Sequence, residues 1–142
     1  MEFSDFVAVL SQWFEHPGGA PLDCWIDDAN ARLSFVEGGL RCSIDVLDPY
    51  DASAPERLMA ILSLGGASVG CHCDGGLATD PESECLVLVY WLALPCTVDA
   101  VLGILQSLAN QRAAMLSQMH QSVHDSHPAE SSAVTHNWLP GV

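Results

Sequence analysis

The chain has 142 residues, the usual length of a single domain, and 49% of them are hydrophobic. Its formal net charge is −14, because it has 18 acidic residues and only four basic ones, all of them arginine. Such a surface repels phosphate backbones and anionic lipid headgroups, which argues against nucleic-acid or membrane binding and favours a basic or weakly structured protein partner.

No apolar run approaches the length of about 20 residues that spans a bilayer. The N-terminus has neither the basic start nor the small-residue cleavage site of a secretory signal. The sequence therefore predicts a cytoplasmic protein. In that compartment the six cysteines are expected to be reduced thiols, buried as small apolar side chains.

Apolar residues recur every three or four positions from residue 4 to 14, which predicts an amphipathic helix that ends at Pro17 and Gly18. Between residues 22 and 46 the apolar period changes to two, with turns rich in Asp, Asn and Gly at 27–30 and 37–39. This alternation predicts a three-stranded antiparallel meander.

Ser53 and Pro55 are typical of a helix start and precede a short apolar helix that ends at two glycines. Two further strands are expected at 67–73 and 84–94, with turns from 74 to 82 between them. The second of these strands is apolar on both faces, so that both faces require burial. Thr97 then caps a final helix whose apolar side reaches Met119.

The predicted order is α-β-β-β-α-β-β-α. Because helices and strands do not alternate as βαβ units, the expected class is α+β, with helices packed on one antiparallel sheet. Residues 1–119 form the single predicted domain. Residues 120–142, rich in His and Ser, form a polar C-terminal tail that is expected to be flexible.

Cys71, His72 and Cys73 form the most conspicuous candidate site for metal or thiol chemistry. On a strand the two cysteines point to one face and the histidine to the other, so the three side chains do not converge on a tetrahedral metal ion. The favoured prediction is therefore a protein without catalytic residues, metal or cofactor. A small metal- or thiol-dependent enzyme centred on these three residues is the alternative.

A second histidine group lies near the C-terminus. His120, His124 and His127 would share one face of a continuing helix, where two of them could contact a metal ion. A solvated helix end, at which cationic histidine is favoured, explains the same pattern. The favoured prediction is the solvated end.

The short second helix and the long strand at 84–94 carry more apolar residues than a sheet covered by helices needs. Exposed apolar surface of this kind usually marks a protein interface. An isologous homodimer is the simplest way to bury it, because dimers of this kind are the commonest symmetric assembly. Burial by the last helix or by the tail of the same chain is the alternative.

The element order, size and acidity resemble those of the class I type III secretion chaperones over about residues 3–119. The segment from 84 to 116, ECLVLVYWLALPCTVDAVLGILQSLANQRAAML, carries the resemblance most clearly. The resemblance implies a cytoplasmic bacterial homodimer that binds the extended N-terminal segment of a secreted effector and keeps it soluble and secretion-competent. A pilotin-like or other adaptor protein with the same layout is a further alternative.

The same resemblance implies residue roles. Effector binding would fall to the first helix and the meander, through Phe6, Trp13, Trp25, Leu33, Phe35 and Leu40. Dimerisation would fall to the second helix and the long strand, through Leu58, Ile61, Leu62, Val87, Val89 and Trp91.

Overall fold

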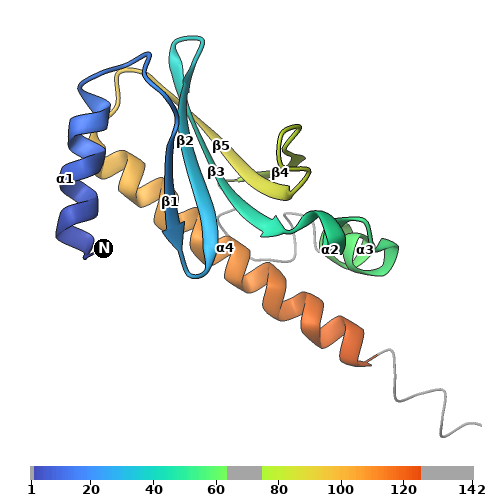
Figure 1. The fold of residues 1–142 in the computed structure, drawn as a ribbon. Coiled ribbons are helices and arrows are strands. Elements are labelled where there is room, and N and C mark those ends of the chain that lie inside the picture. The colour runs from blue at the N-terminus through green and yellow to red at the C-terminus, as the bar shows by residue number, and fades with distance from the viewer. Residues whose placement is uncertain (1, 64–74, 126–142) are drawn as a thin grey trace, which may run out of the picture.

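A five-stranded antiparallel sheet packs on one long helix (Figure 1). The computed structural model describes residues 2–63 and 75–125, with backbone alone for Phe3 and residues 122–125. The strands lie in the order β1-β2-β3-β5-β4 and are β1 (Leu22–Ile26), β2 (Ala29–Val36), β3 (Gly39–Leu47), β4 (Gly76–Thr79) and β5 (Leu86–Ala93). The described helices are α1 (Phe3–Phe14), α2 (Pro49–Ala52), α3 (Pro55–Ser63) and α4 (Val98–Asp125). The predicted class and order are confirmed, with the one-turn helix α2 as an addition before α3.

Two-residue turns set the register of the β1–β2–β3 meander. Asp27 and Asp28 have φ values of 48° and 63°, and Glu37 and Gly38 have φ values of 40° and 77°. Both pairs occupy the left-handed region that a type I′ turn requires at its two central positions. As a result Ile26 lies opposite Ala29 and Val36 lies opposite Gly39.

The fourth strand differs from the prediction. β4 lies at Gly76–Thr79, inside the stretch predicted as turns, where it pairs with β5. The residues predicted as this strand, 67–73, lie outside the described residues, and Cys71, His72 and Cys73 lie there with them. Only four residues long, β4 offers almost no alternation to read, and its place is set by its pairing with β5.

Helix α4 begins where the sequence predicts. The Thr97 side chain accepts a hydrogen bond from the backbone N–H of Ala100 at 3.1 Å, as an N-cap does. The helix then passes the predicted domain boundary at 119 and continues to Asp125. Met115 and Met119 are buried and extend its apolar stripe. The rest of the predicted tail, residues 126–142, lies outside the described residues.

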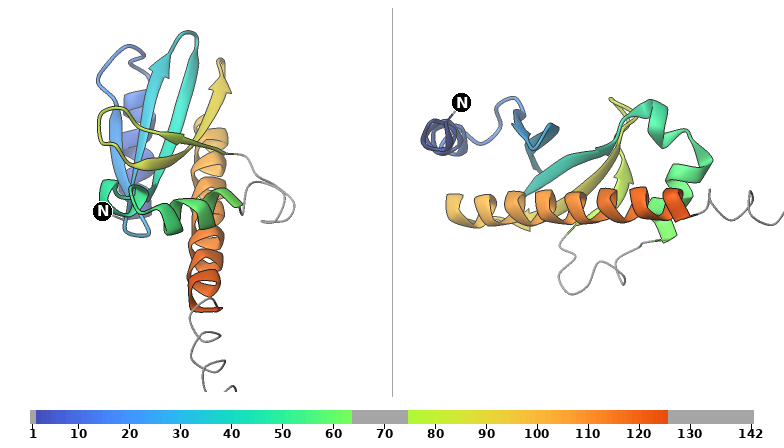
Figure 2. Two further views of the ribbon diagram at one scale, coloured as in Figure 1. Left: turned by 90° about the vertical axis from the view of Figure 1, so that its right-hand side faces the viewer. Right: turned by 90° about the horizontal axis from the view of Figure 1, so that it is seen from below.

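Helix α4 covers one face of the sheet, and no helix of the described residues lies over the other (Figure 2). The core lies between the covered face and α4, where β2, β3 and β5 bury Leu33, Leu40, Ile44 and Leu88 against Val101, Leu105 and Leu108. Leu10 of α1 and Ile61 of α3 complete the core from its two ends. We call the uncovered side, which bears Arg32, Arg41, Ser43, Val89 and Trp91, the open face.

Candidate partner-binding groove

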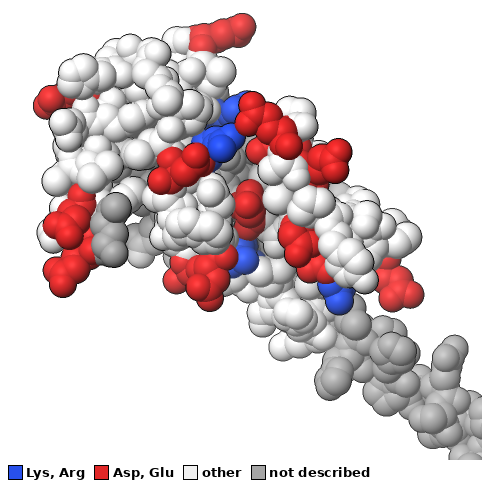
Figure 3. Space-filling model, viewed as in Figure 1, with Lys and Arg blue, Asp and Glu red and all other residues white. Residues whose placement is uncertain are grey.

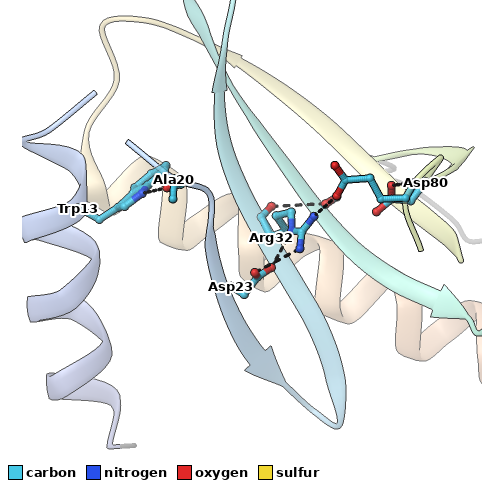
Figure 4. Close-up of polar contacts among 7 residues, drawn as sticks. Trp13, Ala20, Asp23, Arg32 and Asp80 are labelled. Carbon is cyan, nitrogen blue, oxygen red and sulfur yellow. Dashed lines mark hydrogen bonds and ion pairs between the residues drawn. The ribbon is translucent and has the colours of Figure 1, made fainter. Parts of the chain in front are cut away.

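Helix α1 is attached to the sheet through its C-terminal half. The Trp13 ring stacks on Phe35 of β2 with ring centroids 4.6 Å apart, and Phe14 lies tilted against the same ring at 5.8 Å. The Trp13 indole N–H also donates to the Ala20 carbonyl at 2.8 Å, which ties the helix to the loop that follows it (Figure 4). These contacts hold α1 beside the edge strand β1.

A groove of about 860 Å³ opens between α1, β1 and α4. Its apolar lining comes from all three elements and consists of Phe6, Ile26, Leu102, Leu105 and Ala109. Trp25 also lines it and is 75% exposed. This volume lies within the range of clefts that bind ligands, and polar side chains complete the lining.

The outer edge of β1 is free along this groove. Among the described residues β1 is the terminal strand of the sheet and pairs with β2 alone. Because Ile26 and Ala29 flank the two-residue turn, they exchange backbone hydrogen bonds. Every second residue of β1 before Ile26 bonds to β2 in the same way. Asp23 and Trp25 therefore direct their backbone N–H and C=O groups outward, where no described residue bonds to them. An incoming strand can pair with these groups.

Most of the few basic side chains are engaged within the molecule. Arg32 on the open face bonds Asp23 at 2.8 Å and Glu82 at 3.0 Å, which links β1 to the segment between β4 and β5 (Figure 4). Arg57 pairs with Asp51, and Arg112 donates to the carbonyls of Asp45 and Asp27. Figure 3 shows arginine side chains as small blue patches among acidic side chains.

The thiols of Cys24 and Cys42 are poor nucleophiles. Burial raises the pKa of the Cys24 thiol to about 11, with a further contribution from the Asp23 carboxylate. Burial likewise raises the pKa of Cys42 to about 12, and the neighbouring thiols of Cys96 and Cys24 add to the shift. Thiols with such pKa values stay protonated at neutral pH, whereas nucleophilic attack requires the thiolate. Among residues 2–63 and 75–125 no cluster of three His, Cys, Asp or Glu is placed to hold a metal ion.

The predicted effector-binding residues separate into three groups. Phe6 and Trp25 line the groove. Trp13 and Phe35 are half-buried against each other. Leu33 and Leu40 are 0% exposed, on the sheet face that α4 covers. The last two belong to the core, because alternation assigns a side chain to a face but does not say which face is covered.

The predicted dimer residues are divided as well. Ile61 and Val87 are buried within the chain, whereas Leu62 and Trp91 are 51% and 53% exposed. Met59, which the prediction omits, is 66% exposed on α3. The exposed apolar surface of α3 therefore consists of Met59 and Leu62.

Sequence reasoning missed the α4 wall of the groove and its charged positions. Leu102, Gly103 and Asp99 lie on the side of α4 that meets the groove, and Asp27 lies at the end of β1. One signal was present in the sequence, namely Gly103 inside the long helix. A glycine at such a position lowers helix stability by about 1 kcal/mol relative to alanine, and it often marks a place where another chain segment or a ligand approaches the backbone closely.

No protein-family model matches this sequence, and no curated protein does. Among solved structures, the chain is similar to one in the heterodimeric complex ExoU–SpcU from the type III secretion system of Pseudomonas aeruginosa. That match has 18% identity and a TM-score of 0.53, over 78% of this chain and 94% of that chain. It is also similar to a chain of the ExsC–ExsE complex, with 14% identity and a TM-score of 0.51, over 79% of this chain and 92% of that chain.

The chain has the fold of a type III secretion chaperone. The first of these structures comes from a type III secretion system, and the resemblance read from the sequence is confirmed at the level of the fold. The matches cover 94% and 92% of the two solved chains, and 78% and 79% of this one. Within the described part of this chaperone fold, no helix has the length and apolar character to cross a bilayer.

Proposed function

We propose that this chain is a cytoplasmic type III secretion chaperone that binds the extended N-terminal segment of a secreted effector. Binding keeps that segment soluble and competent for secretion. The observation that carries the proposal is an apolar groove lying along a free strand edge, since together they offer backbone pairing and side-chain pockets to one extended chain. The likeness to chaperone–effector complexes supports the same role.

In this proposal the effector segment adds to the sheet as a strand beside β1. Its backbone pairs with the outward N–H and C=O groups of Asp23 and Trp25, and alternate side chains face the groove. Trp25, exposed and aromatic at that position, contributes the largest contact area, as aromatic anchors do in other interfaces.

Two substitutions of Trp25 separate the side-chain contact from the backbone contact. Trp25→Ala removes the indole alone, whereas Trp25→Pro also removes the outward N–H without breaking the β1–β2 ladder. The proline variant is expected to bind the effector about tenfold more weakly than the alanine variant, the effect of one net backbone hydrogen bond. The partner is obtained by co-expressing the chain with each protein encoded beside its gene, and affinities are measured by calorimetry.

The two variants should melt at similar temperatures, because Trp25 is exposed. Equal affinities of the two variants for a co-purified effector would exclude strand addition at β1. Failure of every neighbouring gene product to co-purify with the native chain would contradict the chaperone function itself.

We further propose that the chain forms a homodimer through α3. Ile61 anchors this helix in the core, and Met59 and Leu62 on its exposed surface offer apolar side chains to a second copy. A symmetric contact buries both residues twice, once on each protomer.

Substitution of Leu62 tests the dimer. Leu62→Glu places a charge in the proposed interface and is expected to convert the protein to a monomer in multi-angle light scattering, because an unpaired charge buried there is costly. Val9→Glu, at an exposed position on α1, is the matched control and should leave the mass unchanged. A native chain with the mass of a monomer, or a dimer that survives Leu62→Glu, would refute the α3 interface.

A further inference from the structure

The groove between α1, β1 and α4 has charges of one sign. Asp27 lies at the β1–β2 turn and Asp99 in the first turn of α4, and both line the groove. None of the described residues that line it carries a positive charge. Two of the arginines elsewhere are already paired with carboxylates, and Arg112 binds the backbone carbonyl of Asp27 rather than its side chain.

The two carboxylates mark opposite ends of the groove. Its α4 wall runs from Asp99 to Asn110, which are 11 residues apart and therefore about 16 Å apart along the helix axis. Asp27 lies near the Asn110 end of this wall, because its backbone carbonyl accepts a hydrogen bond from Arg112, two residues beyond Asn110. The apolar lining, including Leu102, Leu105 and Ile26, lies between these two ends.

Gly103 leaves a gap in this α4 wall. Apart from its chain neighbours and the backbone of its own helix, no heavy atom of the described residues lies within 4 Å of a Cβ atom added there. The position lines the groove and is exposed, so an approaching chain can come closer to the helix here than a side chain would permit. The helix tolerates this glycine at a cost in stability, which is consistent with a role in contact rather than in folding.

We propose that the groove selects an extended segment that carries two basic residues, spaced to meet Asp27 and Asp99, with apolar side chains at alternate positions between them. At about 3.3 Å per residue, a separation near 16 Å corresponds to basic residues about four to six positions apart. The apolar side chains rest on the lining, and the segment comes closest to α4 at Gly103. This inference rests on the proposed function, for which it specifies the chemistry of the bound segment.

The probes are two fluorescein-labelled peptides with identical alternating leucines. One has lysines about four positions apart at the flanking sites, and the other has glutamines there. The native chain is expected to bind the lysine peptide about 3- to 30-fold more tightly, as two exposed ion pairs predict. Rising ionic strength should reduce that preference, because exposed charges are screened.

Paired variants locate the charges responsible. Asp27→Asn/Asp99→Asn should abolish the preference for lysine. Glu37→Gln/Glu56→Gln, which removes the same number of charges from exposed positions that do not line the groove, should retain it. Equal loss of the preference in both double variants would show that net charge alone attracts the peptide and would overturn the proposal, as would full retention in both.

Gly103→Leu tests the close approach independently. The substitution favours the helix, so the protein should remain folded with an unchanged or higher melting temperature. Both peptides should bind it at least tenfold more weakly, because the leucine side chain occupies the groove. Unchanged binding of the lysine peptide would overturn the inference.

The same variants, tested with a co-purified effector, distinguish this inference from the proposed function. An effector that binds normally to both groove variants overturns the inference and leaves the chaperone function in place. A chain that discriminates between the peptides but captures no effector supports the groove chemistry and contradicts the function.

Discussion

Replacing Leu33 by alanine is expected to lower the free energy of unfolding by about 2–5 kcal/mol. Leu33 is fully buried on the sheet face that α4 covers, so the truncation removes apolar contacts and leaves a cavity. Leu40, on the neighbouring strand and equally buried, should respond in the same way. Urea unfolding monitored by tryptophan fluorescence measures the loss.

Trp25→Ala is the control for this prediction, since it removes a larger but mostly exposed side chain. Its effect on the free energy of unfolding should stay within about 0.5 kcal/mol, the usual range for a surface substitution. If Leu33→Ala were equally mild, Leu33 would not be a core residue, and its predicted role as an effector contact would stand. The pair therefore separates residues that maintain the fold from residues that meet a partner.

Gln111→Leu is expected to destabilise the protein by about 2–4 kcal/mol, because it leaves two backbone groups without their partners. The Gln111 side chain, buried against the sheet, accepts from the Gly75 N–H and donates to the Gly75 carbonyl, each at 3.1 Å. These two bonds fasten the start of β4 to α4. Leucine has a similar volume and makes neither bond.

Gln106→Leu, the same change at an exposed position of α4, should alter stability by less than about 0.5 kcal/mol. Gly75→Ala offers a second test of the same contact, since a Cβ there would lie 2.6 Å from a Leu108 methyl group. Equal melting temperatures for Gln111→Leu and Gln106→Leu would show that the two hydrogen bonds do not hold β4 in place.

Local patterns were sufficient for most of the fold. Alternation from residue 22 to 46 predicted the meander, because each strand buries one face and its period of two is visible without a partner. Thr97 predicted the start of α4, because its side chain bonds a backbone group three residues away. The strand at Gly76–Thr79 escaped prediction, because a four-residue strand is defined by its pairing with β5 rather than by a pattern of its own.

The site was harder to predict than the fold. Trp25 and Leu33 are both apolar residues of predicted strands, yet Trp25 is exposed and Leu33 is buried. Asp27 and Asp99 are distant along the chain and line one groove only because the β1–β2 turn packs near the side of α4. Nothing within either local segment indicates that the two carboxylates share a surface.

The amino-acid sequence alone was enough for the α+β class, the order of the elements and the acidic character that favours a protein partner. Each of these depends on short-range periodicity or on composition, which need no knowledge of distant contacts. Tertiary packing decided which face of the sheet is covered, where β4 lies and which residues line the groove. Burial depends on the layer that lies opposite, and that layer, α4, comes from a part of the chain far from the strands that it covers.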